Sequence, residues 1–443
     1  MDLGALVGDL SPWLSGRAVA AGRWPERRDL QPRVLARVQD LRNRRATVVL
    51  GPRQVGKSVL LLQLAEDLLS GGWPPSRLLY FDFSDDRVVE ETTVRDVIDA
   101  HERILTGSAV SPREDLPLVL LLDEVSHVPR WDRWLKSAVD SDKFRIVCTD
   151  SAASLMREGA QDSGLGRWDE VDLEGLLFSE FRRIAPEADP LSRYLQLGGF
   201  PAFASGLSIT VARRTLREDI VYKAVERNLV HRIDDISGAK RLFVYLMQDS
   251  GAIYNASKRQ ADLGIHRKQV SAWLELFLDS RLVVSLPRRE LDSAGRKRKS
   301  ASRLGAHPKL YAADHGLIYA FSPLPDPYTD PQVLGQAYEG VVFRHLRALV
   351  ASEESATLSF HRREGEGDFV VDTESGPVVV EVTSQRAARG KLEKLRKVQE
   401  EVGAARALLV YGGIDAREVD GITLVPLPAF LEDPAAVTLG GLS

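Results

Sequence analysis

The residues that point most clearly to chemistry lie in one glycine-rich segment, which reads Gly51-Pro52-Arg53-Gln54-Val55-Gly56-Lys57-Ser58. Its spacing is that of a G-x-x-x-x-G-K-[ST] loop, whose backbone N–H groups surround the phosphates of a nucleotide. Glycine at the two fixed positions removes the Cβ atoms that would keep a phosphate away from the backbone. We therefore predict that this loop binds ATP.

The side chains at the end of the loop have separate roles in this interpretation. Lys57 reaches the β- and γ-phosphates, and the hydroxyl of Ser58 is placed to bind Mg²⁺. Val59 opens the helical stretch that follows, whose N-terminus adds positive potential beside the phosphates. The apolar run Thr47–Leu50 precedes the loop, so strand, loop and helix occur in the order that the motif requires. A chance glycine-rich turn, which is the alternative, would not need that order.

A second chemical signal is an apolar run that ends in two carboxylates: residues 118–124 read Leu-Val-Leu-Leu-Leu-Asp-Glu. Such a run is typical of a strand buried on both faces of a parallel sheet. Taken alone it would simply indicate a strand leaving the core, but here it lies downstream of a phosphate-binding loop. We therefore expect Asp123 to bind Mg²⁺, directly or through water. Glu124 is then the base that orients the attacking water.

Two further positions are candidates for contact with the phosphates. A third apolar segment ends in Thr149, Asp150 and Ser151, of which Asp150 is the predicted sensor of the γ-phosphate. These three residues could equally cap the helix that is expected to follow, which is the commoner use of Ser, Thr and Asp at such a junction. Arg167 follows a glycine-rich loop, where it would reach a phosphate of its own or of a neighbouring subunit. An ordinary surface arginine is the alternative.

The elements that must position these residues alternate between strands and helices. Besides the runs that carry the motifs, strands are expected over Arg77–Phe83 and Phe144–Thr149, and a helix over Pro32–Arg44. This alternation is typical of an α/β fold with a doubly wound parallel sheet. We expect an ATPase domain with a helical lid over residues 31–235, preceded by a loosely ordered lead-in over residues 1–30.

The middle of the chain, residues 236–315, has the pattern of a winged helix-turn-helix. A turn of the required type, Gly264-Ile265-His266, lies between the last two of three helical stretches. The expected elements are helices at Lys240–Gln248, Ala256–Leu263 and Arg267–Asp279 and strands at Leu282–Leu286 and Lys309–Ala312. The polar stretch between the two strands is the predicted wing.

This wing is basic. Within residues 286–303, cations outnumber the carboxylates Glu290 and Asp292. The cations are Arg288, Arg289, Arg296, Lys297, Arg298, Lys299 and Arg303. Together with Arg267 and Lys268 at the start of the third helix, they predict contact with duplex or branched DNA, because phosphates attract such a patch and the major groove admits a helix. A solvated basic run, or a winged helix that binds a protein partner, is the alternative.

Several short segments resemble one family over nearly the whole chain from about residue 33. They are the phosphate-binding loop, the Asp-Glu strand with Trp131 and Trp134-Leu135-Lys136, the pair Gly166-Arg167, and the strings Phe178-Ser179-Glu180-Phe181, Gly198-Gly199-Phe200-Pro201 and Tyr311-Ala312-Ala313-Asp314-His315-Gly316-Leu317. The chain resembles bacterial and archaeal AAA-type ATPases in which a restriction-endonuclease-like half follows the ATPase. That resemblance implies the fold and ATP binding, whereas most members have no established task. Asp150 departs from the pattern, which more often has Gly or Asn there.

The last part of the chain, residues 316–443, has the order helix, three strands, helix and strand. In nucleases of the restriction-endonuclease type, a helix glutamate, a strand aspartate and a Glu-x-Lys motif gather Mg²⁺. The corresponding residues here are Glu339, Asp368 and Glu381, a candidate second metal site. Position 383 is threonine instead of lysine, which argues against cleavage, although Lys391 could supply the missing group. We therefore expect an α/β domain that grips DNA without cutting it.

Composition limits what else the chain can be. It has 443 residues, a formal net charge of −4 and one cysteine, Cys148. A single cysteine excludes an internal disulfide and favours the reducing cytoplasm. No apolar stretch approaches the roughly 18 residues that span a bilayer. Because the overall charge is negative, any contact with DNA must come from a local patch.

Together these patterns predict a cytoplasmic ATPase that binds and remodels DNA, with no membrane association. In a homo-oligomer Arg167 would act across an interface, whereas in a monomer it would act on its own site. Two other functions stay open: a nucleotide-gated switch or scaffold that binds a protein through the winged helix, and an ATP-dependent nuclease.

Overall fold

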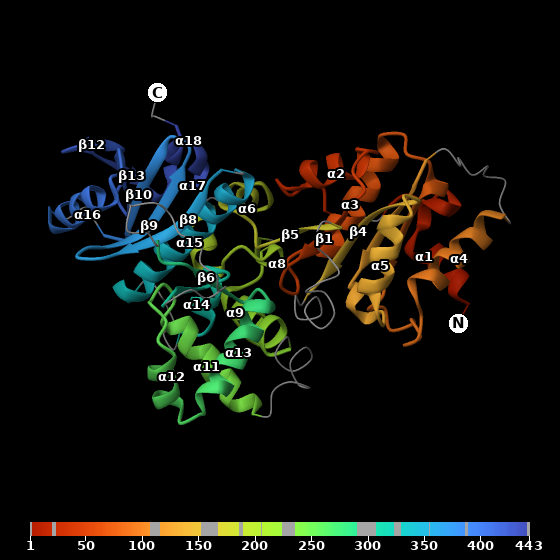
Figure 1. The fold of residues 1–443 in the computed structure, drawn as a ribbon, viewed down its shortest axis with the longest axis horizontal. Helices are drawn as coiled ribbons and strands as arrows, with labels where there is room; N and C mark the ends of the chain where they lie inside the picture. The colour runs from red at the N-terminus through yellow and green to blue at the C-terminus, as the bar shows by residue number, and fades with distance from the viewer. Residues whose placement is uncertain are drawn as a thin grey trace. The chain divides into compact units, whose positions relative to one another are not determined.

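The chain forms two compact units, the first of residues 1–174 with 279–281 and the second of residues 175–278 with 282–443. In the computed structural model of the chain, the described residues are 2–19, 24–106, 116–151, 167–185, 189–204, 206–223, 235–289, 307–322, 329–353, 355–385 and 389–440. Figure 1 follows them from the N-terminus in red to the C-terminus in blue.

The first unit is built on a five-stranded parallel sheet with the strand order β2-β3-β4-β1-β5. The strands are β1 (Ala46–Leu50), β2 (Leu78–Asp82), β3 (Leu118–Asp123), β4 (Phe144–Asp150) and β5 (Trp168–Asp172). β1 and β3 are mostly aliphatic and are buried at every residue, as strands covered on both faces must be. The predicted α/β fold with a parallel sheet is therefore confirmed for the N-terminal part of the chain.

Helices cover both faces of this sheet (Figure 1). They are α1 (Leu3–Leu10), α2 (Gln31–Gln39), α3 (Lys57–Ser70), α4 (Val94–Thr106) and α5 (Trp131–Asp140), with 3-10 turns η1 (Pro12–Ser15), η3 (Pro75–Arg77) and η4 (Val125–His127). α2 and α3 pack on one face, whereas α1, α4 and α5 pack on the other. Side chains alternate accordingly along β4, where Val147 faces α3 and Cys148 faces the opposite layer.

The first residues of the chain are folded, which corrects the expectation of a loosely ordered lead-in. α1 buries Leu6 and Val7 in the core beside α4 and β2. Trp13 donates a hydrogen bond from Nε1 to the carbonyl of Leu78 at 2.9 Å. The helix has only eight residues and contains two glycines, so its own propensity is poor. Packing against the sheet stabilises it, and no local pattern announces such packing.

The second unit begins with short helices. They are α6 (Phe178–Ile184), α7 (Pro190–Leu197), α8 (Pro201–Ala204), α9 (Ile209–Thr215) and a π-helical segment, η6 (Leu216–Tyr222). The sequence suggested that this stretch belongs to the ATPase domain as a lid, but its contacts group it with the C-terminal part of the chain.

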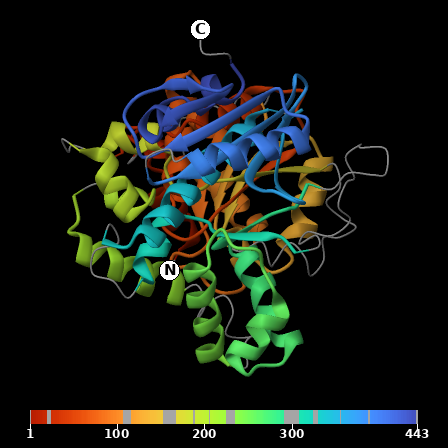
Figure 2. The ribbon, with the colours of Figure 1, turned by 90° about the vertical axis from the view of Figure 1, so that its left-hand side faces the viewer.

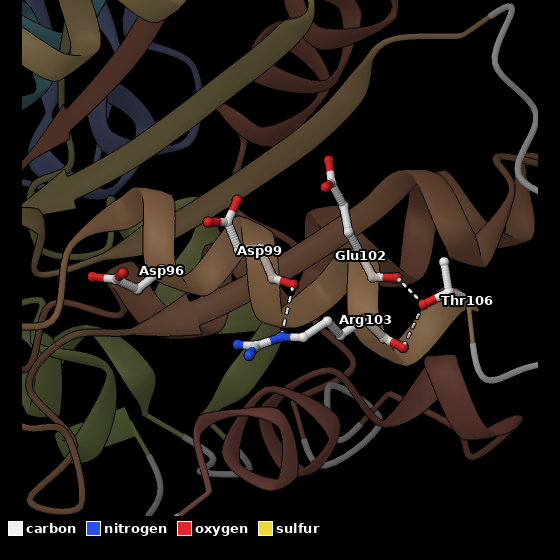
Figure 3. A pocket seen from close by; sticks show the side chains of 5 residues that line it. All are labelled: Asp96, Asp99, Glu102, Arg103 and Thr106. Carbon is white, nitrogen blue, oxygen red and sulfur yellow. Dashed lines mark hydrogen bonds between the residues drawn. The ribbon is translucent and has the colours of Figure 1, made fainter.

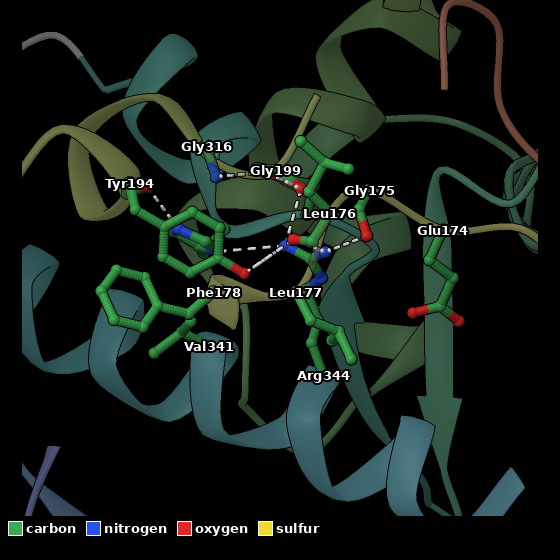
Figure 4. A network of polar contacts seen from close by, with 12 residues as sticks. Glu174, Gly175, Leu176, Leu177, Phe178, Tyr194, Gly199, Gly316, Val341 and Arg344 are labelled. Atoms are coloured by element: carbon green, nitrogen blue, oxygen red, sulfur yellow. Dashed lines mark hydrogen bonds and ion pairs between the residues drawn. The ribbon is translucent and has the colours of Figure 1, made fainter. Parts of the chain in front are cut away.

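A buried ion pair between Arg344 and Asp314 holds the start of this unit in place. Figure 4 shows Arg344 beside Gly175 and Leu176. Arg344 Nη1 lies 2.8 Å from Asp314 Oδ2, and Nη2 donates to the carbonyls of Gly175 at 2.7 Å and Leu176 at 3.0 Å. Asp314 Oδ2 also accepts a hydrogen bond from the backbone N–H of Gly199 at 2.9 Å. Because both charges are paired and further hydrogen-bonded, their burial is tolerated and the segment after residue 174 is fixed.

Three helices and a hairpin follow in the order expected from the sequence. They are α11 (Ile236–Gln248), α12 (Ala256–Leu263) and α13 (Arg267–Asp279), then β6 (Val283–Leu286) and β7 (Lys309–Ala312). The three helices lie side by side, coloured green in Figures 1 and 2. Phe243 of α11 packs edge to face on Phe277 of α13, with ring centroids 5.1 Å apart. Gly264 ends α12 with a φ of 66°, a left-handed conformation that favours glycine.

The rest of the unit is a six-stranded mixed sheet with the order β12-β13-β11-β10-β9-β8. Its elements are α14 (His315–Ala320), α15 (Pro331–Ser352), β8 (Thr357–Arg362), β9 (Glu366–Thr373), β10 (Gly376–Thr383), α16 (Arg389–Val402), β11 (Arg406–Tyr411), β12 (Arg417–Val419), β13 (Ile422–Pro426), α17 (Leu427–Glu432) and α18 (Pro434–Thr438). α15 packs on one face and α16 on the other. No helix among the described residues has the length and apolar character to cross a membrane.

The hairpin of β6 and β7 is joined to the edge of this sheet. Phe360 of β8 accepts a hydrogen bond from the N–H of Arg289 at 2.8 Å and donates one to the carbonyl of Pro287 at 3.0 Å. The segment that follows β6, residues 287–289, is therefore paired with β8.

Candidate nucleotide site

The predicted phosphate-binding loop connects β1 to α3 at the carboxyl end of the parallel sheet. Gln54 has a φ of 62° and Gly56 a φ of 101°, so the backbone enters the left-handed region twice within three residues. At Gly51, an added Cβ would lie 2.2 Å from the carbonyl oxygen of Leu173. Glycine is thus required at position 51 by close approach and at position 56 by backbone conformation.

Lys57 is the centre of the site. Its side chain is only 5% exposed, and Nζ donates to the carbonyls of Gly51 at 3.0 Å and Pro52 at 3.2 Å and to Ser151 Oγ at 2.8 Å. Nζ also lies 3.4 Å from Glu124 Oε1. One ammonium group therefore joins the loop, the end of β4 and the carboxylate that follows β3.

Asp123 ends β3 and is fully buried. Thr149 Oγ1 donates to its Oδ1, and the hydroxyl of Tyr80 donates to its Oδ2 at 3.2 Å. Burial raises the pKa of the Asp123 carboxyl, and hydrogen bonds from Ser58 and Thr149 oppose that rise. A carboxylate bonded to the Ser58 hydroxyl forms the oxygen-rich donor set that suits Mg²⁺. These residues therefore fit the metal that the phosphate-binding loop implies.

Glu124 is held in an unusual backbone conformation, with a φ of 47°. Such a conformation is uncommon for a residue with a side chain and clusters at functional sites. Ser151 Oγ donates to Glu124 Oε1 at 2.5 Å, and Thr149 Oγ1 accepts from the backbone N–H of Glu124 at 3.0 Å. Burial alone would raise the pKa of Glu124, but the charge of Lys57 and the hydrogen bond from Ser151 lower it overall. Glu124 is therefore an ionised carboxylate, able to accept a proton.

The polar end of β4 contributes to the site through residues other than the predicted sensor. Thr149 and Ser151 contact Asp123, Glu124 and Lys57, whereas Asp150 supplies its carbonyl to the N–H of Gly51 at 3.4 Å. The side chain of Asp150 follows Cys148 on the face away from α3, because alternate residues of a strand point to opposite faces. Ser151 is the residue at this end of β4 whose side chain contacts both Lys57 and Glu124, and the sensor role of Asp150 stays a prediction.

The other predicted loop residues have supporting positions. Val55 is buried in the core beneath α3, and Val59 is half-buried in the first turn of that helix. Arg53 contributes to the electrostatic field at Glu124 and lowers its pKa. The carbonyl of Val55 accepts a hydrogen bond from Arg28 Nη1 at 3.3 Å, a contact with the N-terminal segment that the sequence did not indicate.

Arg167 lies at the opposite end of the sheet from the loop. It precedes β5, which runs parallel to β1, and its carbonyl accepts from the N–H of Ala46 at the start of β1 at 3.0 Å. Its guanidinium pairs with Asp140, with Nε 3.2 Å from Oδ1. A five-residue strand spans about 17 Å, so Arg167 does not reach the phosphate-binding loop of its own chain. Its action across a subunit interface stays a prediction.

A hollow along α4 is separate from this site (Figure 3). It is lined by Asp96, Asp99, Glu102, Arg103 and Thr106, all on one helix. Arg103 Nε donates to the carbonyl of Asp99 at 3.3 Å, and the Thr106 hydroxyl donates to the carbonyls of Glu102 and Arg103. None of the predicted nucleotide-binding residues lines it.

The predicted DNA-contacting cations have different environments. Arg267 and Lys268 are exposed at the start of α13. Arg288 is exposed beside β8, but Arg289 forms an ion pair with Asp372 at 2.9 Å in which the two side chains are 9% and 10% exposed. Arg289 therefore stabilises the sheet edge instead of presenting its charge to solvent. The remaining predicted cations, Arg296, Lys297, Arg298, Lys299 and Arg303, lie outside the described residues.

The three carboxylates of the candidate second metal site lie near one another. Asp368 accepts a hydrogen bond from the N–H of Val382 at 3.1 Å, and the N–H of Asp368 donates to Glu381 Oε2 at 3.3 Å. Lys309 of β7 lies 3.3 Å from both Glu339 and Asp368. Within the part of the chain that the structure describes, no group of three His, Cys, Asp or Glu residues is arranged to hold a metal ion.

Comparison with known proteins agrees with the geometry of the first unit. Residues 43–182 match a family described as an AAA domain. Residues 188–328 and 334–430 match two domains of unknown function, DUF8612 and DUF4143. The N-terminal part of the chain is therefore similar to an AAA domain, and the two families that match the residues after it have no assigned function.

Two similar proteins are described as uncharacterised. An uncharacterised protein of Haemophilus influenzae is 26% identical over 289 residues, which cover 61% of this chain and 67% of that protein. An uncharacterised protein of Methanocaldococcus jannaschii is 22% identical over 419 residues, covering 86% of this chain and 83% of that protein.

Solved structures resemble the chain only distantly. A Walker-type ATPase of Pyrococcus abyssi has a TM-score of 0.43 at 14% identity, covering 70% of this chain and 99% of its own. The Aeropyrum pernix ORC1 protein, solved in complex with DNA, has a TM-score of 0.31 at 13% identity, covering 68% of this chain and 94% of its own. Scores this low provide no basis for transferring a function.

Proposed function

We propose that the first unit binds ATP with Mg²⁺ and hydrolyses it. The observation that carries the proposal is the convergence of Lys57, Ser151 and Glu124, joined by contacts of 2.8, 2.5 and 3.4 Å at the carboxyl end of a parallel sheet. A lysine and an ionised carboxylate beside a glycine-rich loop are the groups that nucleotide hydrolysis requires. The AAA-domain match over residues 43–182 supports the same conclusion.

In this mechanism the chain supplies position and charge. Lys57 exchanges its contacts with the loop carbonyls for oxygens of the β- and γ-phosphates, and Glu124 accepts a hydrogen bond from the attacking water and orients it. Ser58 and Asp123 would hold Mg²⁺, which neutralises charge on the phosphate oxygens when bound. Ser151 keeps the Glu124 carboxylate aligned before substrate arrives.

The first test is Lys57→Ala. Removal of the ammonium group should weaken ATP binding by about 100-fold or more, because charge-assisted hydrogen bonds are roughly twice as strong as neutral ones and several are lost together. Isothermal titration with ATP and Mg²⁺ measures the change. The exposed Lys143 on the same unit offers a control, since Lys143→Ala should bind ATP as the unaltered chain does.

The second test is Glu124→Gln, which keeps the shape of the side chain and removes its basicity. Turnover should fall by about 10²- to 10⁴-fold, while ATP binding is retained. Phosphate release and ATP titration on the same preparation measure the two effects. Full turnover in this variant would remove Glu124 from the mechanism.

We also propose that the second unit couples hydrolysis to DNA. Support comes from the exposed cations Arg267 and Lys268, which stand at the start of the helix that follows the turn at Gly264. ATPase rates measured with single-stranded, duplex and branched DNA at two salt concentrations test this. Stimulation that weakens with salt supports DNA as the partner, because each phosphate contact contributes about −0.9 to the log–log slope on duplex DNA. A rate indifferent to DNA at low salt favours the nucleotide-gated switch that binds a protein.

A further inference from the structure

The second carboxylate cluster contains a buried lysine that comes from a different part of the fold. Lys309 begins β7, the return strand of the hairpin, and its side chain is 3% exposed. Nζ lies 3.3 Å from Glu339 Oε1 on α15 and 3.3 Å from Asp368 Oδ1 on β9. Glu366, also on β9, lies 3.9 Å away. Three carboxylates therefore surround one buried lysine side chain.

Further groups contact the carboxylates of this cluster. Tyr311 donates from its hydroxyl to Glu339 Oε1 at 2.6 Å. Glu381, which is 2% exposed, lies 3.3 Å from Lys394 Nζ and 3.8 Å from Lys391 Nζ, both on α16. Asp368 Oδ2 accepts the backbone N–H of Val382 at 3.1 Å. Every carboxylate of the candidate metal site therefore has an ammonium group as its neighbour.

These residues do not fit a divalent metal ion. Mg²⁺ requires oxygen ligands at about 2.0–2.1 Å in near-octahedral geometry. An ion bound by both Glu339 and Asp368 would have to occupy the space between their oxygens, which is where Lys309 Nζ lies. The ammonium cannot share that space, and as a like charge it would also repel the metal. Moving the buried Lys309 ammonium away from its carboxylates would leave charges without compensation, so the lysine is favoured over a metal ion at this position.

We infer that Lys309 is the resident cation of this cluster, taking the place that a metal ion has in nucleases of the restriction-endonuclease type. The cluster of Glu339, Asp368 and Lys309 is then an ion-pair clamp. It fixes β7 of the helix-turn-helix hairpin to α15 and β9, and it performs no metal-dependent hydrolysis. The inference is independent of ATP hydrolysis in the first unit.

The location of Lys309 explains why sequence patterns alone did not predict this arrangement. Thr383 stands where the Glu-x-Lys motif would have its lysine, and the nearest lysines in sequence, Lys391 and Lys394, reach only Glu381. Lys309 is more than fifty residues away from Asp368 along the chain and belongs to an element with a different expected role. Pairing of β7 with Ile253 and with β6 brings it to the cluster.

Manganese binding to the nucleotide-free, full-length chain tests the inference. Free Mn²⁺ is followed by electron paramagnetic resonance, and binding that is absent from Glu339→Gln is assigned to the cluster. We expect the unaltered chain and Glu339→Gln to bind equally up to about 1 mM Mn²⁺, at the weak end of protein affinities for such ions. Mn²⁺ binding that the unaltered chain shows and Glu339→Gln lacks would overturn the inference. This holds for any result obtained with lysine variants.

Lys309→Met supplies the complementary measurement. It retains the length of the side chain and removes its charge, so the clamp should be lost and the melting temperature should fall by several degrees. Mn²⁺ should then bind to the vacated carboxylates at least tenfold more tightly than to the unaltered chain, or raise the melting temperature of the variant selectively. Lys397→Met, on the exposed side of α16, is the control and should change neither property. A Lys309→Met chain with unaltered melting temperature and unaltered Mn²⁺ affinity would overturn the clamp.

Discussion

Single residues decide the chemistry of the first unit, and Ser151 is the one whose contribution only the structure reveals. Its hydroxyl accepts a hydrogen bond from Lys57 at 2.8 Å and donates one to Glu124 at 2.5 Å. Ser151 thus links Lys57, which in our proposal binds phosphate, to Glu124, which in our proposal orients water. A hydroxyl in this position can report on the γ-phosphate, because any movement of Lys57 toward a phosphate changes the bond that holds Glu124.

Replacement of Ser151 by alanine should reduce turnover while leaving ATP affinity almost unchanged. Hydrogen bonds to charged groups contribute about 1.5–3 kcal/mol, so kcat should fall by roughly 10- to 100-fold, whereas the Kd for ATP should change by less than about threefold. Steady-state kinetics and ATP titration separate the two parameters. Ser141→Ala, at the exposed end of α5, is a control that should leave both unaltered. A loss of ATP affinity with kcat unaltered would show that Ser151 acts only in binding.

At the scale of residues, the sequence predicts the side chains whose positions follow from a fixed spacing. It does not predict those whose contacts depend on which face of a strand they occupy. Lys57 and Ser58 follow from the loop spacing, and Asp123 and Glu124 from the end of an apolar run. The choice among Thr149, Asp150 and Ser151 depends on which face of β4 each side chain occupies. Both faces of this strand are buried, so the sequence contains no polar alternation that would indicate the answer.

At the scale of elements, the hairpin of β6 and β7 is docked on the edge of the six-stranded sheet. Arg289 contributes to this through its ion pair with Asp372 on β9. Removing one partner of such a buried pair lowers the free energy of unfolding strongly, because the remaining charge is left without compensation. Replacing both partners with apolar residues is tolerated better. The sequence predicted the two strands correctly but assigned Arg289 to DNA, because a local count of charges cannot show which of them is buried.

Arg289→Met should therefore destabilise the chain by about 3 kcal/mol, and Arg289→Met combined with Asp372→Leu should recover part of that loss. Urea denaturation of the four members of the double-mutant cycle measures the coupling between the two side chains. The control is Arg362→Met, since Arg362 is 52% exposed and 4.0 Å from Glu366. Its loss should cost less than about 1 kcal/mol. A single variant as stable as the double variant would contradict the buried pair.

The elements that the sequence predicts well are those with strong internal periodicity. α11, α12 and α13 lie at or within a few residues of their expected boundaries, and β3 and β10 match their apolar runs. The elements α1 and β12, with eight and three residues, are too short to reveal a period. Their stability comes from tertiary packing, which is why the structure was needed to find them.

At the scale of the whole molecule, buried ionisable groups make the free energy of unfolding depend on pH. His315 and His345 are fully buried in the second unit beside Arg344. His345 Nε2 accepts a hydrogen bond from the N–H of Phe178 at 3.1 Å, and Nδ1 lies 2.8 Å from the carbonyl of Val341. Each ring nitrogen therefore has the partner that a neutral imidazole requires. Burial lowers the pKa of His345 to about 3 and that of His315 to about 4.

The sign of the resulting pH dependence follows from proton uptake on unfolding. An unfolded histidine has a pKa of about 6.5, so below that pH the unfolded chain binds protons that the folded chain does not. The free energy of unfolding therefore falls as the pH drops from about 6.5 toward the folded pKa values, by about 1.4 kcal/mol per pH unit for each histidine. Burial raises the pKa of Glu339 and Glu381. Over part of this range, these two groups therefore make the free energy of unfolding rise as the pH drops. The net slope of the unaltered chain is consequently smaller than the contribution of its histidines.

His345→Gln isolates one of these contributions. Glutamine retains an acceptor for the N–H of Phe178 and cannot be protonated, so the loss of stability between pH 6.5 and pH 5 should shrink by about 2 kcal/mol relative to the unaltered chain. Urea denaturation at several pH values across this range gives the two slopes, and the absolute stability of the variant does not enter the comparison. His266→Gln is the matched control, because His266 is exposed and its replacement should leave the slope unaltered. Parallel slopes for His345→Gln and the unaltered chain would mean that His345 is protonated in the folded chain, in conflict with the hydrogen bond that it accepts from Phe178.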